Sequence, residues 1–247
     1  MLTLDEKKIR KGRPIGLPYQ GSKKKISKKI VEIIKQNFGT DKTVYDIFGG
    51  CGAITAECLL NGLEVHYNDF DSIITSMFQK VVSEDRDYLK TLIVSRDEFF
   101  RIRDKENKSV NDNLKLLVNS FGNDRKSYLY SKGMSDLKYN LAVEIVKKHD
   151  IFYEYRKTEA YLKALQDFKD QHYQKTRLQQ LGRLQQLGRL QQLGQLEQLQ
   201  RLQQLEQLEQ LEQLEVTNLN YTEFSDIENA ILYLDPPYEN TTLKGYS

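Results

Sequence analysis

A glycine-rich turn between a short apolar strand and a helix is the feature that most restricts how this chain can fold. Thr43–Ile47 reads Thr-Val-Tyr-Asp-Ile, a run typical of a β-strand, and leads directly into Phe48–Gly52, which reads Phe-Gly-Gly-Cys-Gly. Ala53–Leu60 then favours a helix that Gly62 closes. Glycines at the end of a strand let the backbone approach a ligand closely. NAD, FAD, S-adenosylmethionine and no ligand at all are each compatible with such a turn.

A second strand and an acidic residue strengthen the nucleoside interpretation. Glu64–Tyr67 favours a strand that ends in Asn68-Asp69, and Ser72–Val82 returns to a helical pattern, which completes a β-α-β unit with a right-handed crossover. Asp69 follows the glycine turn by about 20 residues, where a carboxylate can accept hydrogen bonds from both ribose hydroxyls. The alternative is a solvated aspartate in a turn.

The N-terminal segment is strongly basic. Residues 1–30 contain ten lysines and arginines and two acids, a net charge of +8, whereas the whole chain carries +2. A block of this kind suits the phosphates of nucleic acid, and a solvated basic tail is the alternative. An amphipathic helix is predicted over Ser22–Phe38 and begins within this basic segment, with Ser22 as its N-cap and Gly39 as its C-terminal stop.

Two unusual segments interrupt the α/β pattern. Residues 83 to about 175 are mostly helical in pattern, with a capping box expected at Ser95–Glu98, and they indicate an inserted helical subdomain. Arg177–Glu215 is a low-complexity repeat with three copies of Arg-Leu-Gln-Gln-Leu-Gly and leucine at every third position from Leu178 to Leu214.

The repeat has an ambiguous structure by itself. A period of three drifts by about 60° per step around an α-helix, so the leucines are expected to spiral, which disfavours a coiled coil. The composition favours helix, and a small β-solenoid, an extended chain or disorder are the alternatives. We interpret the repeat as an expansion within a tolerant surface insertion, with binding of a partner as the alternative.

The most specific motif stands near the end of the chain. Val216–Tyr221 and Ile231–Leu234 favour strands, the second being an apolar run suited to the middle of a parallel sheet, and it leads into Asp235-Pro236-Pro237-Tyr238. An exocyclic amine on an aromatic ring is a poor nucleophile, and hydrogen bonds from its N–H groups to the Asp235 carboxylate and the Pro236 carbonyl would activate it. The two prolines fix the backbone, and Tyr238 can stack on an extruded base.

Composition excludes several other classes of protein. The 247 residues are 39% hydrophobic, without an apolar run of membrane-spanning length or a secretory signal, so a soluble cytoplasmic protein is expected. Cys51 and Cys58 lack the spacing of a zinc site, and the three histidines are scattered. We therefore predict no metal and no membrane association.

Taken together, these motifs resemble the Dam-like family of DNA adenine N6-methyltransferases. The order of the motifs agrees, and Tyr19-Gln20-Gly21-Ser22-Lys23 is similar to the family's basic N-terminal motif. The resemblance implies S-adenosylmethionine as cofactor and double-stranded DNA as partner. It implies that the cofactor contacts Tyr19, Lys23, Asp46, Phe48, Gly49, Gly50, Gly52, Asp69 and Asp235. It implies that the catalytic residues are Asp235, Pro236, Pro237 and Tyr238, with the adenine attacking the sulfonium methyl in line.

The expected fold is therefore an α/β, Rossmann-like, three-layer methyltransferase core with an incomplete parallel sheet, a helical insertion and a leucine-rich low-complexity repeat. The expected parts are residues 1–82 for the cofactor, 83–176 for DNA recognition, 177–215 for the repeat and 216–247 for the catalytic motif. Within the same chemistry, the alternative substrates are cytosine N4, an RNA adenine and a protein glutamine.

Three departures from the family accompany the resemblance. Ser22 replaces a second glycine, and Asn220 stands where the family often has aspartate before an aromatic residue. The family's sheet also has strands after the catalytic motif that this sequence lacks, so the core is expected to be truncated and to expose an apolar strand edge. A non-enzymatic remnant that binds DNA or a partner is the alternative from another class.

Overall fold

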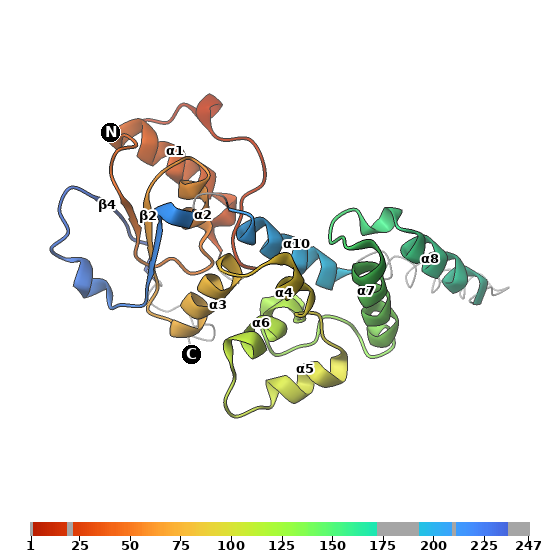
Figure 1. Ribbon diagram of the computed structural model, residues 1–247. Coiled ribbons are helices and arrows are strands. Elements are labelled where there is room, and N and C mark those ends of the chain that lie inside the picture. The colour runs from red at the N-terminus through yellow and green to blue at the C-terminus, as the bar shows by residue number, and fades with distance from the viewer. Residues whose placement is uncertain (1, 19–21, 172–192, 209–210, 237–247) are drawn as a thin grey trace. The chain divides into compact units, whose positions relative to one another are not determined.

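The structure is a computed structural model that describes residues 2–18, 22–171, 193–208 and 211–236 (Figure 1). It divides into two compact units. Met1–Leu89 and Arg201–Ser247 form the first, called here the sheet unit, and Lys90–Gln200 form the second, called the helical unit. None of the helices in these described residues is long and apolar enough to cross a bilayer.

Four parallel strands form the sheet of the sheet unit. They are β1 (Val44–Asp46), β2 (Val65–Asn68), β3 (Leu214–Thr217) and β4 (Ile231–Tyr233), in the order β3-β2-β1-β4. In register, Asp46 stands between Tyr67 of β2 and Tyr233 of β4. The predicted α/β class with a parallel sheet is therefore confirmed.

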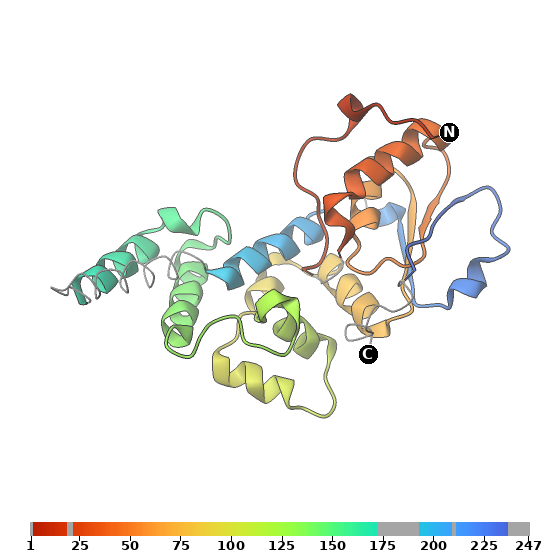
Figure 2. The ribbon, with the colours of Figure 1, turned by 180° about the vertical axis from the view of Figure 1, so that it is seen from behind.

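Helices cover one face of this sheet. Asp46 and Tyr67 point to that face, where Asp46 bonds Thr55 of α2 (Ala53–Leu59) and the Tyr67 ring stacks on Phe78 of α3 (Ser72–Val82). In both views α1 (Ser27–Phe38) and α2 lie on one side of the sheet and residues 218–230 on the other (Figures 1 and 2). Along the chain, β2 and then β3 are added on one side of β1, and the chain then crosses back to add β4 on the other side of β1. Right-handed crossovers therefore place the two connections on opposite faces.

The second face is covered by an irregular connection. It contains the 3₁₀-helix η6 (Tyr221–Phe224), from which Phe224 packs edge-on against His66 at 5.5 Å between ring centroids. His66 in turn stacks on Tyr45 at 4.8 Å. The described residues thus build this outer layer from a 3₁₀-helix and a loop, where the three-layer prediction expected α-helix.

Several predicted boundaries need correction. Ser22 caps the 3₁₀-helix η2 (Lys23–Lys25), and α1 begins only at Ser27, although Gly39 does end it. The strand predicted over Val216–Tyr221 is β3, which starts at Leu214 inside the repeat. The strand expected in the middle of the sheet is β4, which lies at its edge.

The position of β4 leaves apolar side chains in solvent. Leu232 is 40% exposed and Leu234 is 57% exposed, because no strand among the described residues pairs with the outer side of β4. An apolar run by itself cannot distinguish a central strand from an edge strand. The exposed apolar edge expected from the sequence is therefore present in this part of the chain.

The helical unit is built from short helices. They are α5 (Arg96–Arg103), α6 (Val110–Val118), α7 (Ser135–His149) and α8 (Glu159–Gln171), with α4 (Arg86–Lys90) and α10 (Gly194–Glu206) spanning its boundaries with the sheet unit. Its core includes Val94, Phe99, Ile102, Leu116, Tyr128 and Tyr130. At the expected capping box, Ser95 accepts a hydrogen bond from the Glu98 amide, but both Glu98 oxygens bind Arg101. The reciprocal box instead forms between Ser109 and Asp112.

Most leucines in the described part of the repeat are buried. Residues 194–206 form α10, which confirms helix over that stretch, whereas residues 177–192 lie outside the described residues. The leucines of residues 193–208 are fully buried or nearly so, whereas Leu211 and Leu214 are partly exposed; the buried ones are Leu193, Leu196, Leu199, Leu202, Leu205 and Leu208. Steps of about 60° carry these leucines around most of the helix, which must then pack on several sides. The interpretation as a surface insertion is therefore wrong for residues 193–208.

Candidate active site

The polar segments singled out in the sequence meet at one edge of the sheet. The glycine turn Phe48–Gly52 follows β1, Asp69 follows β2, and Asp235 lies two residues after the end of β4. Because the strands are parallel, their carboxyl ends share that edge. The strand order reverses between β1 and β4, and ligands of open α/β sheets bind at such a reversal.

Asp69 is bonded to the glycine turn. Its Oδ2 accepts a hydrogen bond from the Gly50 amide at 2.8 Å, and its Oδ1 accepts one from the Asp71 amide at 2.9 Å. Burial raises the pKa of the Asp69 carboxyl, and these two amide bonds oppose that effect. Each carboxylate oxygen can accept a further hydrogen bond, so Asp69 remains able to bind a diol.

Asp235 forms an ion pair with the basic N-terminal motif. Lys23 Nζ lies 2.7 Å from Asp235 Oδ2, and both side chains are partly buried. Ser22, the residue before Lys23, bonds the glycine turn through the Cys51 thiol at 3.0 Å. The structure thus brings together three motifs that are far apart in the sequence.

Gly49 and Gly52 of the turn are required by packing. A Cβ on Gly49 would lie 2.3 Å from Tyr67 Cε2, and one on Gly52 would lie 2.1 Å from Phe78 Cε2. The Tyr67 and Phe78 rings are fully buried and stack at 4.4 Å between centroids. The sequence attributed these glycines to contact with a cofactor, whereas their observed neighbours are the two stacked rings.

Asp46 lies behind the turn, inside the core. It is 1% exposed, and its Oδ2 accepts hydrogen bonds from the Thr55 hydroxyl at 2.7 Å and the Thr55 amide at 3.2 Å. Burial raises the pKa of Asp46 to about 7, with smaller contributions from the negative charges of Asp69 and Asp235. Through these two hydrogen bonds the Asp46 carboxylate holds the start of α2.

This raised pKa predicts a specific pH dependence of stability. The unfolded carboxyl releases its proton near pH 4 and the folded one near pH 7, so Asp46 lowers stability progressively as the pH rises between these values. Asp46→Asn keeps an acceptor for Thr55 and cannot ionise, and it is expected to be more stable than the unsubstituted chain by roughly 4 kcal/mol at pH 8. Urea unfolding at pH 5 and pH 8 measures this difference. A difference that is equal at both pH values would contradict the assignment.

Asn68 is a site residue that the sequence analysis did not single out. Its side-chain amide donates to the carbonyls of Ile47 and Leu219, and its Oδ1 accepts from Thr217 and the Leu219 amide. It thereby joins the ends of β1, β2 and β3 beneath Asp69. A polar residue at the last position of a buried strand is the signal that could have identified it.

Aromatic residues stand beside the same edge. The Phe48 and Tyr221 ring centroids are 6.0 Å apart, and Tyr221 and Phe70 are largely exposed. Asn220, one of the departures from the family pattern, uses its Oδ1 to accept hydrogen bonds from the Thr222 amide and hydroxyl. Pro236 is exposed, and Tyr19, Pro237 and Tyr238 lie outside the described residues.

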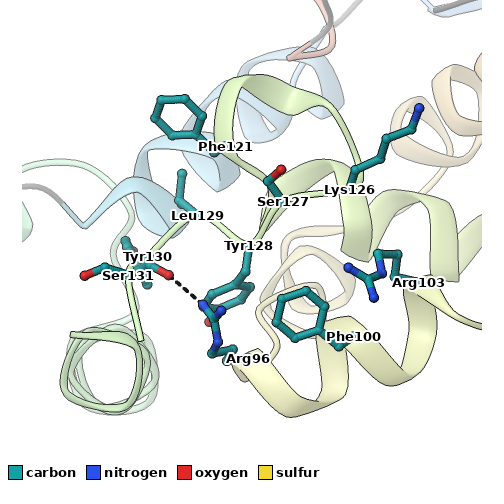
Figure 3. A pocket seen from close by; sticks show the side chains of 10 residues that line it. All are labelled: Arg96, Phe100, Arg103, Phe121, Lys126, Ser127, Tyr128, Leu129, Tyr130 and Ser131. Atoms are coloured by element: carbon teal, nitrogen blue, oxygen red, sulfur yellow. Dashed lines mark hydrogen bonds between the residues drawn. The ribbon is translucent and has the colours of Figure 1, made fainter. Parts of the chain in front are cut away.

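The helical unit carries a separate pocket of about 570 Å³, called here the basic pocket. It is lined by Arg96, Phe100, Arg103, Phe121, Lys126, Ser127, Tyr128, Leu129, Tyr130 and Ser131. Arg96 donates to the Tyr130 carbonyl at 2.9 Å and lies against the Tyr128 ring (Figure 3). The Phe100 ring has Arg96 at 4.9 Å and Arg103 at 4.5 Å from its centroid. The lining thus combines three cations with aromatic faces.

Among the described residues, no three histidine, cysteine or acidic side chains gather where they could hold a metal ion.

Comparison with known proteins gives one clear result. A family model described as D12 class N6 adenine-specific DNA methyltransferase matches residues 19–183, more than half of the chain. The matched range contains Lys23, the glycine turn and Asp69, and ends before Asp235. No curated relative and no solved structure matches the chain. The chain therefore belongs to the D12 class of N6 adenine-specific DNA methyltransferases, which are enzymes that methylate adenine in DNA.

Proposed function

We propose that the sheet edge around Phe48–Gly52 binds S-adenosylmethionine and that Asp235 holds the N6 amine of a flipped adenine beside it. The observation that carries this proposal is the meeting of Asp69, the glycine turn and the Lys23–Asp235 pair where the strand order reverses. Methyl transfer to duplexes that contain or lack A·T pairs tests it, because only the former should become labelled.

The residues present fit this cofactor. Asp69 carries its carboxylate charge beside the glycine turn and is held there by backbone amides, whereas Asp235 at the same edge is paired with Lys23. Such a site favours a ligand with cationic groups, as the sulfonium and α-amino groups are. When bound, S-adenosylmethionine supplies an electrophilic methyl group on its sulfonium sulfur.

Each residue of the chain has a defined task in this proposal. Asp69 accepts hydrogen bonds from the ribose hydroxyls while it keeps its bond to Gly50. Asp235 and the Pro236 carbonyl accept the N–H groups of the adenine amine and stabilise the positive charge that develops on it. Lys23 holds the Asp235 carboxylate in place until the amine shares it.

Replacing Asp69 tests the cofactor site. Asp69→Ala removes a charged acceptor from two ribose hydroxyls, so the Kd for S-adenosylmethionine should rise by roughly 10- to 100-fold. Isothermal titration calorimetry measures this change. The exposed Asp41→Ala serves as the control, and equal affinities of the two variants would exclude Asp69 from the site.

We further propose that the helical unit contacts the DNA backbone through the basic pocket. Arg96, Arg103 and Lys126 supply positive charge, and the pocket lining includes no carboxylate, although Arg103 also pairs with Asp104 outside it. Guanidinium groups that are held against aromatic rings are already oriented for phosphate, which reduces the entropy lost on binding.

The salt dependence of DNA binding tests this contact. Lys126→Ala should weaken duplex binding several-fold and lower the slope of log K against log salt concentration by about one. Lys148→Ala is the matched control, because Lys148 is an exposed lysine of the same unit that pairs with Glu144 away from the pocket. Fluorescence anisotropy over a salt series measures both. Identical slopes for the two variants would remove the basic pocket from the DNA interface.

A further inference from the structure

The end of the last Arg-Leu-Gln-Gln-Leu-Gly copy enters the core of the helical unit. Leu193 and Gln195 are both fully buried. The Leu193 amide donates to the Tyr155 hydroxyl at 3.0 Å, and the Gln195 amide donates to the Tyr130 hydroxyl at 3.2 Å. Each of these bonds ties the start of α10 to a residue far away in the sequence.

The Gln195 side chain completes a buried hydrogen-bond network. Its Nε2 donates to the Val94 carbonyl at 3.0 Å, to Asn119 Oδ1 at 2.5 Å and to the Tyr128 hydroxyl at 3.3 Å. Asn119 is itself fully buried and bonds the Leu92 and Lys115 carbonyls. The Gln195 Nε2 thus faces three oxygen atoms in a buried site, and its two N–H groups can donate to two of them at a time, while its Oε1 is buried without a hydrogen-bond partner among the described residues.

Gly194 lies between Leu193 and Gln195, and the space around it has no room for a side chain. A Cβ there would lie 2.8 Å from Leu129 Cδ2 and 3.4 Å from Leu129 Cγ. Any larger residue at this position would force Leu129 to move. The core of the helical unit thus accepts the sequence Leu-Gly-Gln at the start of α10.

The repeat alone would allow α10 to dock in several registers. Because leucine recurs at every third position, sliding the sequence by three residues puts a leucine in each buried leucine position. A slide by three places Gln191 or Glu197 at the position of Gly194. A slide of six toward the preceding copy restores glycine with Gly188 but places Arg189 at the position of Gln195.

An arginine at the Gln195 position would be unfavourable. It is longer than glutamine, and its charge would be fully buried among two carbonyl oxygens and a hydroxyl, none of which carries a negative charge. Leu-Gly-Gln occurs once in the sequence, at residues 193–195, whereas Leu-Gly-Arg occurs twice. One register alone therefore satisfies both the glycine and the glutamine positions.

We propose that Leu193-Gly194-Gln195 fixes the register in which the leucine repeat docks in this fold. Because the leucine positions of the repeat are equivalent, the tripeptide determines which stretch of the repeat forms α10. Whole copies upstream of the tripeptide can therefore be gained or lost without a change in the residues that form α10. The register of α10 does not depend on the proposed cofactor or DNA contacts.

Two single substitutions test the proposal first. Gln195→Arg should lower the thermal unfolding midpoint of the full chain by on the order of 10 °C. Gln204→Arg is the matched control, because Gln204 occupies the same place in its triplet but is only partly buried, and it should leave the midpoint nearly unchanged. Equal midpoints for the two variants would overturn the proposal.

A second-site substitution distinguishes register from a merely structural effect. Adding Arg189→Gln to Gln195→Arg recreates Leu-Gly-Gln one copy upstream, and the arginine at position 195 then takes the place of the exposed Arg201. The double variant should recover most of the lost stability. Hydrogen exchange with mass spectrometry should show the protected stretch beginning six residues earlier. A double variant no more stable than Gln195→Arg, or protection that stays in place, would overturn the proposal.

Discussion

Asp235→Ala is expected to slow methyl transfer by roughly 10²- to 10⁴-fold while the Kd for S-adenosylmethionine stays within a few-fold of its original value. The substitution removes the carboxylate that accepts the N–H of the adenine amine and stabilises its developing charge. It also removes the ion pair with Lys23, whose ammonium lies 2.7 Å from Asp235 Oδ2. Single-turnover transfer of labelled methyl, together with calorimetric cofactor binding, separates the effect on the rate from the effect on affinity.

Two control variants sharpen this prediction. Asp226→Ala removes an exposed carboxylate from the same connection between β3 and β4, and it should leave the rate unchanged. Asp235→Asn keeps a neutral acceptor and should retain more activity than the alanine variant. Retained activity in Asp235→Ala would remove this residue from the catalytic site.

Gly52→Ala is expected to be the most destabilising single change in the glycine turn, at roughly 4 kcal/mol. Its φ of 68° is strained for alanine, and the added Cβ would lie 2.1 Å from Phe78 Cε2. Phe78 cannot easily move, because it is fully buried and stacks on Tyr67. Urea unfolding monitored by circular dichroism measures the loss.

Gly62→Ala separates backbone strain from steric overlap. Gly62 has a similar φ of 72°, but a Cβ there would meet no heavy atom within 4 Å. It should therefore cost only about 1 kcal/mol. If both variants lose the same free energy of unfolding, the stacked rings are not what requires glycine at position 52.

Elements set by local sequence were predicted most accurately. The helix over Ser72–Val82 has the predicted bounds, and β1 and β2 differ from the predicted strands by one residue at each end. The Asp71 side chain caps that helix, so a local residue determines where the helix begins.

Elements that depend on tertiary surroundings were predicted less well. The apolar residues of β4 are equally compatible with the centre and the edge of a sheet, and β3 begins inside a segment that resembles the rest of the repeat. The repeat leucines are buried because other elements pack around α10. The spacing of the leucines in the sequence does not reveal which elements those are. The sequence indicated that glycine was needed at positions 49 and 52, but the reason became visible only with Tyr67 and Phe78 in place.

Within the site, most of the residues that meet at the sheet edge were singled out from the sequence, and Asn68 was not. Asp69 bonds the Gly50 amide and Asp235 pairs with Lys23, although each contact joins residues from separate motifs. The roles assigned to these side chains in methyl transfer stay predictions. Asp46 is a different case, since its carboxylate is buried against Thr55. Residue type and spacing alone do not reveal which side of a turn a side chain faces.

The most direct test of the account is the identity of the methylated base. The purified 247-residue chain would be incubated with unmethylated duplex DNA and S-adenosylmethionine carrying a radiolabelled methyl group, and the DNA bases would then be separated by chromatography. The account predicts label in N6-methyladenine. Label in N4-methylcytosine, or cofactor that binds without any transfer of label to DNA, would contradict it.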